Sequence, residues 1–129
     1  MVTATKIGRL HKLKQTYGVT TMPAKYIGLD GSADAESASQ EAPSQELTTG
    51  GCGRVEATVT DVSEGSTTAL KLTANYEFDA ANTINAVFGA WSASPGNNMT
   101  WRHKLTSPQN VGPEDTMTFE LTDTEGVVV

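Results

Sequence analysis

The chain has 129 residues, a mass of 13.6 kDa and a formal net charge of −6, which suits one domain with one modest core. The lone Cys52 excludes an internal disulfide, and two histidines far apart in the sequence give no zinc-ligand spacing, so we expect no cofactor and no metal. No apolar run reaches the ~20 residues that cross a bilayer, and the start of the chain lacks the apolar segment of a signal peptide. We therefore expect a soluble protein.

The charge is unevenly distributed along the chain. The first 25 residues hold five basic side chains and no acid, whereas the remainder holds four basic and fifteen acidic ones. A basic N-terminal arm (residues 1–24) thus precedes an acidic domain (residues 25–129). Four apolar residues of the arm recur at spacings of three and four, as on one helical face. Because Gly8 interrupts this pattern, a short helix and an extended arm both remain open.

Residues 25–29 predict a brief strand, and residues 32–53 form a long acidic surface loop rich in Ser, Ala, Glu, Gln and Gly. The start of this segment places oxygen-bearing side chains at positions 1, 3, 5, 7 and 12 of an EF-hand-like calcium loop, namely Asp30, Ser32, Asp34, Glu36 and Glu41. Ala35 replaces the glycine that the sharp turn needs, and no amphipathic helix flanks the segment. The pattern therefore favours a solvated acidic loop over a calcium site.

From residue 54 onward, apolar and polar residues alternate, which is typical of half-buried strands. Strands are expected over 55–60, 70–78, 84–90, 99–105 and 117–121, with 84–90 central and 107–113 a loop. Nineteen threonines also favour strands. The expected fold is all-β, an antiparallel β-sandwich or jelly-roll-like domain with an extended N-terminal arm. The expected core comprises Val59, Leu72, Tyr76, Phe78, Ile84, Phe88, Trp101, Phe119 and Leu121.

Catalytic chemistry is not indicated by the sequence. A nucleophile needs a base and an orienting group within reach, and no pattern pairs Cys52 or a serine with either histidine. His103 lies between two basic residues on an apolar face and is expected to be a packed or interface histidine. His11 belongs to the basic arm. We therefore expect a protein that is not an enzyme.

The basic arm is the candidate binding element, which we expect to become ordered on the particle or on a neighbouring subunit and not in its own core. Its cations could contact a phosphate backbone, but the acidic domain and the single aromatic residue Tyr17 favour docking onto an acidic protein surface. Neither a nucleic acid nor a membrane is an expected partner. The candidate partner-binding residues are Lys6, Ile7, Arg9, Leu10, Lys12, Leu13, Lys14 and Tyr17.

An order of short motifs covers about residues 25–122. These motifs are Lys25-Tyr26-Ile27-Gly28-Leu29-Asp30-Gly31, Gly53-Arg54-Val55, Tyr76-Glu77-Phe78-Asp79-Ala80, Thr83-Ile84-Asn85-Ala86-Val87-Phe88-Gly89-Ala90, Trp101-Arg102-His103-Lys104-Leu105 and Val111-Gly112-Pro113-Glu114-Asp115. In this order the chain resembles a diffuse group of virion structural proteins of tailed bacteriophages. It departs from that group at two places. Ala86 stands where a glutamate is usual, and Phe88-Gly89-Ala90 stands where the group has a glycine-leucine-phenylalanine step.

The resemblance implies a structural protein of the phage virion, made in the host cytoplasm. Because the sequence ends soon after its last expected strand, without shaft or receptor-binding modules, we expect a decoration (cement) protein on the outer capsid surface. The implied partners are the major capsid protein and copies of the chain itself, in a homotrimer. The alternative is a tail or fibre component.

Overall fold

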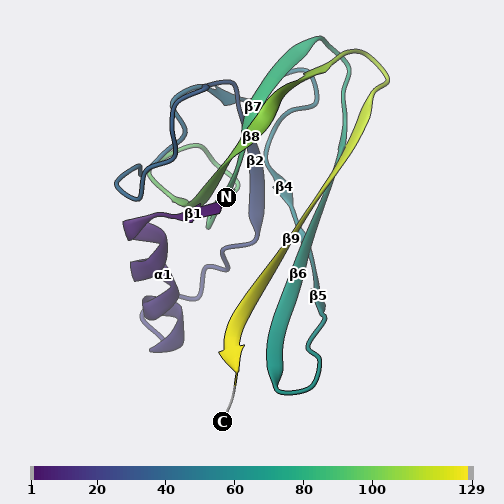
Figure 1. Cartoon of the computed structure of the whole chain (residues 1–129). Helices are drawn as coiled ribbons and strands as arrows, with labels where there is room; N and C mark the ends of the chain where they lie inside the picture. Colours follow the sequence, from purple (N-terminus) through teal and green to yellow (C-terminus); the bar gives the residue numbers. More distant parts are fainter. Residues whose placement is uncertain (1, 128–129) are drawn as a thin grey trace.

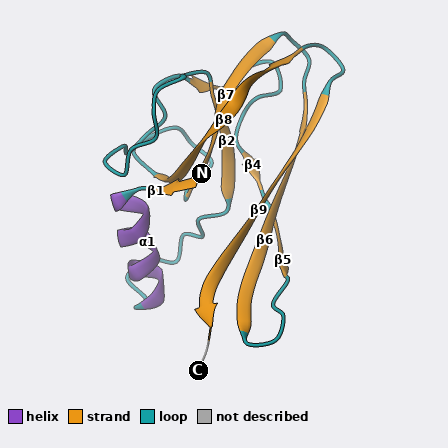
Figure 2. Cartoon of the chain, in the orientation of Figure 1, coloured by secondary structure: helices purple, strands orange, loops and turns teal. Residues whose placement is uncertain are grey.

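Residues 2–127 are described by the computed structural model of the chain. Strands dominate the fold, and one helix stands beside them (Figures 1 and 2), which confirms the all-β expectation. The elements in chain order are β1 (Val2–Ala4), α1 (Lys6–Thr16), β2 (Tyr26–Asp30), β3 (Glu46–Leu47), β4 (Val55–Glu56), β5 (Thr58–Asp61), β6 (Thr67–Glu77), β7 (Asn82–Ala90), β8 (Met99–Val111) and β9 (Thr116–Val127).

The strands form two antiparallel sheets that pack into a β-sandwich. Sheet A has the order β1-β8-β7-β2-β3, with β4 paired to the other end of β2, and sheet B has the order β5-β6-β9. The chain passes between the sheets three times, first from β4 to β5 and then through two connections, from β6 to β7 and from β8 to β9. Backbone hydrogen bonds from Phe78 N–H to the Asp115 carbonyl (2.9 Å) and from Glu114 N–H to the Phe78 carbonyl (2.9 Å) tie these two connections together.

Most of the expected core lies between the sheets. Tyr76, Phe78 and Ile84 are buried there as predicted, whereas Leu72, Trp101, Phe119 and Leu121 are half-buried. Phe88 is also buried, but in a separate cluster with Ala90 and Met99 on the other face of sheet A. The expectation for Val59 is wrong, because its side chain is 46% exposed on the edge strand β5. The alternation of apolar and polar residues assigned Val59 to the correct face of sheet B, but sheet A does not extend over this part of sheet B. Buried residues that the alternation did not include are Ile27, Leu29, Cys52, Val87 and Met99.

Strand β7 is central, as expected, between β8 and β2. The loop expected at residues 107–113 is wrong, because β8 continues to Val111 and pairs there with the start of β7. A register shift between Ile84 and Ala86 accommodates the extra residues of β8, including Pro108. Proline in this strand is tolerated because the bulge removes the need for its missing N–H.

The N-terminal arm is ordered on the domain. Strand β1 pairs with β8, and the next residue, Thr5, accepts a hydrogen bond at its hydroxyl from Gly8 N–H (2.9 Å), which caps helix α1. The arm is thus a strand and a helix rather than an extended segment. The expectation that it packs only on a partner is wrong. None of the described helices has the length and apolar character to cross a membrane.

Two buried arginines hold the segment 32–53 against sheet A. Arg102 donates to the Asp30 carboxylate (3.1 Å) and to the carbonyls of Ser32 (2.8 Å) and Asp34 (2.8 Å). Arg54 donates to both carboxylate oxygens of Glu46, each at 2.8 Å. The expectation of a solvated loop is therefore wrong for Asp30 and Ser32, which are buried because the guanidinium compensates the carboxylate and both carbonyls.

Candidate functional site

Helix α1 packs on sheet A through a narrow inward face. Gly8 lies so close to the backbone of Thr100 that any Cβ at this position would overlap it. One turn later, the buried His11 ring stacks on Trp91 with 4.3 Å between the ring centroids and an interplanar angle of 4°. The small residue and the flat ring allow the helix to approach the sheet edge closely.

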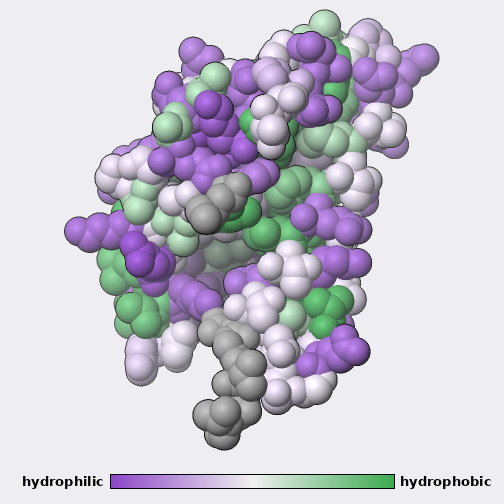
Figure 3. All heavy atoms as spheres, viewed as in Figure 1, coloured by the Kyte–Doolittle hydropathy of each residue, from purple (hydrophilic) through white to green (hydrophobic). Residues whose placement is uncertain are grey.

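The opposite face of α1 is apolar and points outward. At about 100° per residue, Leu10, Leu13 and Tyr17 lie on the side opposite Gly8 and His11. Their side chains are 51%, 56% and 78% exposed. Hydrophobic atoms gather at the left edge of the molecule, where α1 lies (Figure 3). A helix normally turns its apolar stripe to its own core, so this stripe is available to a partner.

Cations flank the apolar stripe. Lys6 lies on the same side of the helix, and Arg9 and Lys14 border it on either side; all three side chains are exposed. The arm contributes no acid to neutralise them. Lys25, the fifth cation of the N-terminal region, forms an ion pair with Glu56 and is not part of this face. We call the set Lys6, Arg9, Leu10, Leu13, Lys14 and Tyr17 the outward face of α1.

Both ends of the helix are fastened to the domain. The Lys6 N–H donates to the Ala38 carbonyl (2.7 Å), and at the other end the Gln15 side-chain amide donates to the Met22 carbonyl (2.8 Å). The His11 Nε2 atom also lies 2.8 Å from this carbonyl. The outward face is therefore held in place before any partner binds, which lowers the entropy cost of docking.

The eight residues predicted for partner binding all lie on α1 or at its C-terminal end. Seven are exposed and Ile7 is half-buried. Lys12 projects from a different side of the helix and lines a pocket beside sheet B. Sequence reasoning missed Val19 and Met22, which are exposed apolar residues in the turn that follows α1. They fall outside the helical spacing, because the chain reverses at Gly18 with a φ of +72°.

The potential catalytic groups lie in ordinary packing environments. Cys52 is fully buried, and burial, followed by the charge of Asp79, raises the pKa of its thiol, which lowers the thiolate fraction. His103 is half-buried, with its Nδ1 atom 3.9 Å from a carboxylate oxygen of Glu36. Within residues 2–127, no group of three or more His, Cys, Asp or Glu side chains is arranged to hold a metal ion.

Comparison with known proteins identifies the family. The sequence model of a family described as podophage GP4 fiber I protein gp80 matches residues 11–126. No curated protein and no solved structure matches the chain. The match covers the second half of α1 and the strands from β2 onward, so it includes Leu13, Lys14 and Tyr17 of the outward face but begins after Lys6, Arg9 and Leu10. The chain therefore belongs to the podophage GP4 fiber I protein family, a family of phage structural proteins.

Proposed function

We propose that this chain is a structural subunit of a phage fibre and that it joins its neighbour in the virion through the outward face of α1. The family description favours the fibre alternative over the capsid decoration protein that the sequence resemblance implied. The family match carries this proposal, and the exposed stripe supports it by supplying a ready-made contact.

The outward face has the energetics of an assembly contact. Full burial of a large apolar side chain contributes about 1.5–3 kcal/mol, and Leu10, Leu13 and Tyr17 are each at least half exposed. The flanking cations favour an acidic partner surface and speed the encounter. An acidic protein surface can both cover the apolar stripe and pair with the cations, whereas a phosphate backbone would leave the apolar stripe uncovered.

The proposal includes no catalytic step, no cofactor, and neither a nucleic acid nor a membrane as partner. The candidate partners are further copies of the chain, which we infer below, and another virion protein. In the fibre proposal the major capsid protein is not the primary partner. A homotrimer remains a prediction that the assembly measurements below would test.

Location in the particle tests the proposed function. Gold labelling of this chain on intact virions should place the label on fibres in electron micrographs. Label spread over the shell would instead support a capsid decoration protein and contradict the fibre proposal.

A substitution in α1 tests the contact. Purified Leu13→Glu should bind particles lacking the protein at least about tenfold more weakly than the wild-type chain, since it places a carboxylate in the apolar stripe. Thr60→Glu is the matched control: it makes the same kind of charge addition at an exposed position on the outer face of sheet B, away from α1, and should bind normally. Equal binding by Leu13→Glu would exclude this face. Anionic vesicles serve as a further control, since binding to them would indicate a membrane surface instead.

A further inference from the structure

Sheet B extends beyond the cover of sheet A. Cross-strand neighbours share a face, so the strand register places Tyr76 with Met117 and Ala74 with Phe119 on the inner face. These rows are covered: Tyr76 and Ala74 are buried, and Phe119 stacks against Trp101 of sheet A with ring centroids 5.8 Å apart. Toward the other end of β6 the cover is lost (Figure 1).

The uncovered end of the inner face is apolar with acidic sides. The row at its margin joins Val59, Leu72 and Leu121, of which Leu72 still packs against the core, and the next row joins Asp61, Leu70 and Asp123. Val59 is 46% and Leu70 is 47% exposed. Val59 and Leu70 both lie on the inner face of sheet B, the face that packs against sheet A elsewhere. They are exposed because no element covers them there.

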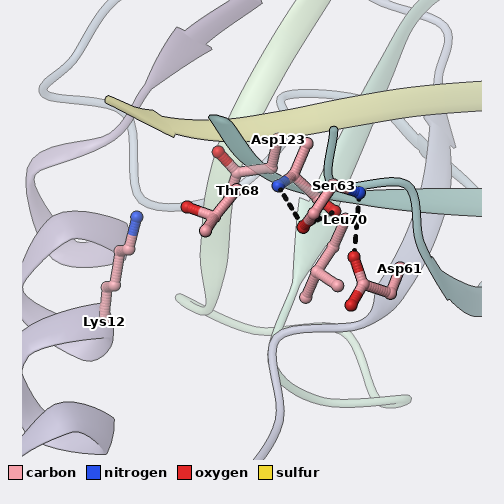
Figure 4. A pocket seen from close by; sticks show the side chains of 7 residues that line it. Lys12, Asp61, Ser63, Thr68, Leu70 and Asp123 are labelled. Carbon is pink, nitrogen blue, oxygen red and sulfur yellow. Dashed lines mark hydrogen bonds between the residues drawn. The ribbon is translucent and has the colours of Figure 1, made fainter. Parts of the chain in front are cut away.

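A pocket of about 420 Å³ opens at this end, between sheet B and helix α1. Leu70 and Asp61 lie on the sheet side, and Lys12 lies across from them on α1 (Figure 4). The Ser63 hydroxyl and its N–H, which donates to Asp61 (2.9 Å), both lower the pKa of this carboxyl. We call this site the sheet B pocket; it is lined by Lys12, Asp61, Ser63, Thr68, Ala69, Leu70 and Asp123.

The outward face of α1 and the sheet B pocket complement each other. The helix presents apolar side chains flanked by cations, and the pocket presents an apolar floor between two carboxylates. The two cannot meet within one chain while α1 is docked, because Gly8 and His11 fix the helix with its stripe directed away from the sandwich. The match can therefore be satisfied only between two copies.

We propose that the outward face of α1 of one copy seats in the sheet B pocket of a second copy. Leu10 and Leu13 would cover Leu70 and Val59, and Arg9 and Lys14 would lie near Asp61 and Asp123. This inference rests on the proposed role of the outward face in assembly and names its partner. Each such contact leaves one helix and one pocket unused, so the association is head-to-tail and continues into a ring or a filament.

Complementation between two variants tests this geometry. A helix variant, Arg9→Glu with Leu13→Glu, and a pocket variant, Asp61→Lys with Asp123→Lys, are compared with the wild-type chain by analytical ultracentrifugation. The wild-type chain should form oligomers that grow with concentration and dissociate with added salt. Each variant alone should remain monomeric. An equimolar mixture should form a one-to-one dimer and stop there, because it contains only one intact pair of surfaces.

The controls separate loss of contact from loss of fold. Glu77→Lys with Glu120→Lys makes the same charge reversal on the outer face of sheet B and should associate like the wild-type chain. Circular dichroism and thermal melting verify folding of each variant. A wild-type chain that stays monomeric, or variants that still associate, would overturn the proposal. One combination of results separates this proposal from the proposed function: the wild-type chain stays monomeric, and Leu13→Glu still loses binding to particles. That combination would show that the outward face of α1 binds another virion protein, and the proposed function would stand.

Discussion

Arg102 is the residue on which the long segment 32–53 depends most. Its side chain is 1% exposed and its three hydrogen bonds reach Asp30, Ser32 and Asp34, about 70 positions earlier in the sequence. Asp30 in turn accepts hydrogen bonds from the N–H groups of Ser32 (2.9 Å) and Gln45 (3.0 Å). One buried ion pair thus fixes the start of the segment and, through Gln45, a point in its second half.

Replacing Arg102 should therefore destabilise the protein strongly. Arg102→Met keeps much of the side-chain volume but leaves the Asp30 carboxylate buried without its partner, which costs about 3–5 kcal/mol in the free energy of unfolding. Urea denaturation followed by circular dichroism measures this. Lys71→Met removes one partner of the exposed ion pair with Glu120 and should cost less than about 1 kcal/mol. Similar losses for both variants would show that the buried pair has no special role.

The role of Arg102 could not be predicted from the sequence. Alternation along 99–105 assigned Trp101, His103 and Leu105 to one apolar face and thereby placed Arg102 on the other. Whether that other face is solvent or core depends on what covers sheet A. The segment 32–53 covers it, and its Ser, Ala and Glu composition gives no periodic signal for such packing.

Among the elements, α1 shows that a spacing pattern can predict a helical face correctly without predicting whether that face turns to the core or to solvent. The spacing of Ile7, Leu10, Leu13 and Tyr17 identified a shared helical face, and the structure confirms the helix. An apolar stripe usually marks the face turned to the core. Here Gly8 and His11 form that contact instead, because close approach to Thr100 requires a residue without a Cβ, and no spacing rule detects this.

Substitution of Gly8 should detach α1 from the sheet. Gly8→Ala raises helix propensity by about 1 kcal/mol, yet the new Cβ would overlap backbone atoms of Thr100, which cannot rotate away. We expect the clash to prevail, so amide protons of α1 should exchange about tenfold faster or more. Gly112→Ala is the control, since the nearest atom to its added Cβ is 3.8 Å away. Unchanged protection of α1 would mean that the helix does not depend on this close approach.

At the scale of the whole molecule, the sequence predicted a sandwich but not the offset between its sheets. Period-two alternation reports which side of a strand is apolar, and it does so for Val59 and Leu70 as well as for Tyr76. It does not report how far along the strand the opposite sheet extends. That length depends on where β7 and β8 end, and on the position of α1 beside them.

The offset predicts a gradient of stability along sheet B. In dilute protein, backbone amides of residues 67–72 should exchange faster than those of residues 73–77. Both stretches have strand hydrogen bonds, but the second lies under sheet A, whereas cover is lost along the first, where Leu72 still packs against the core and Leu70 is exposed. Hydrogen exchange with mass spectrometry measures both stretches in one experiment. When the protein is concentrated at low salt, head-to-tail docking should slow exchange in residues 67–72 and leave residues 73–77 unchanged. Uniform protection at both concentrations would instead show that the sandwich opens as a single unit and that its uncovered end needs no partner.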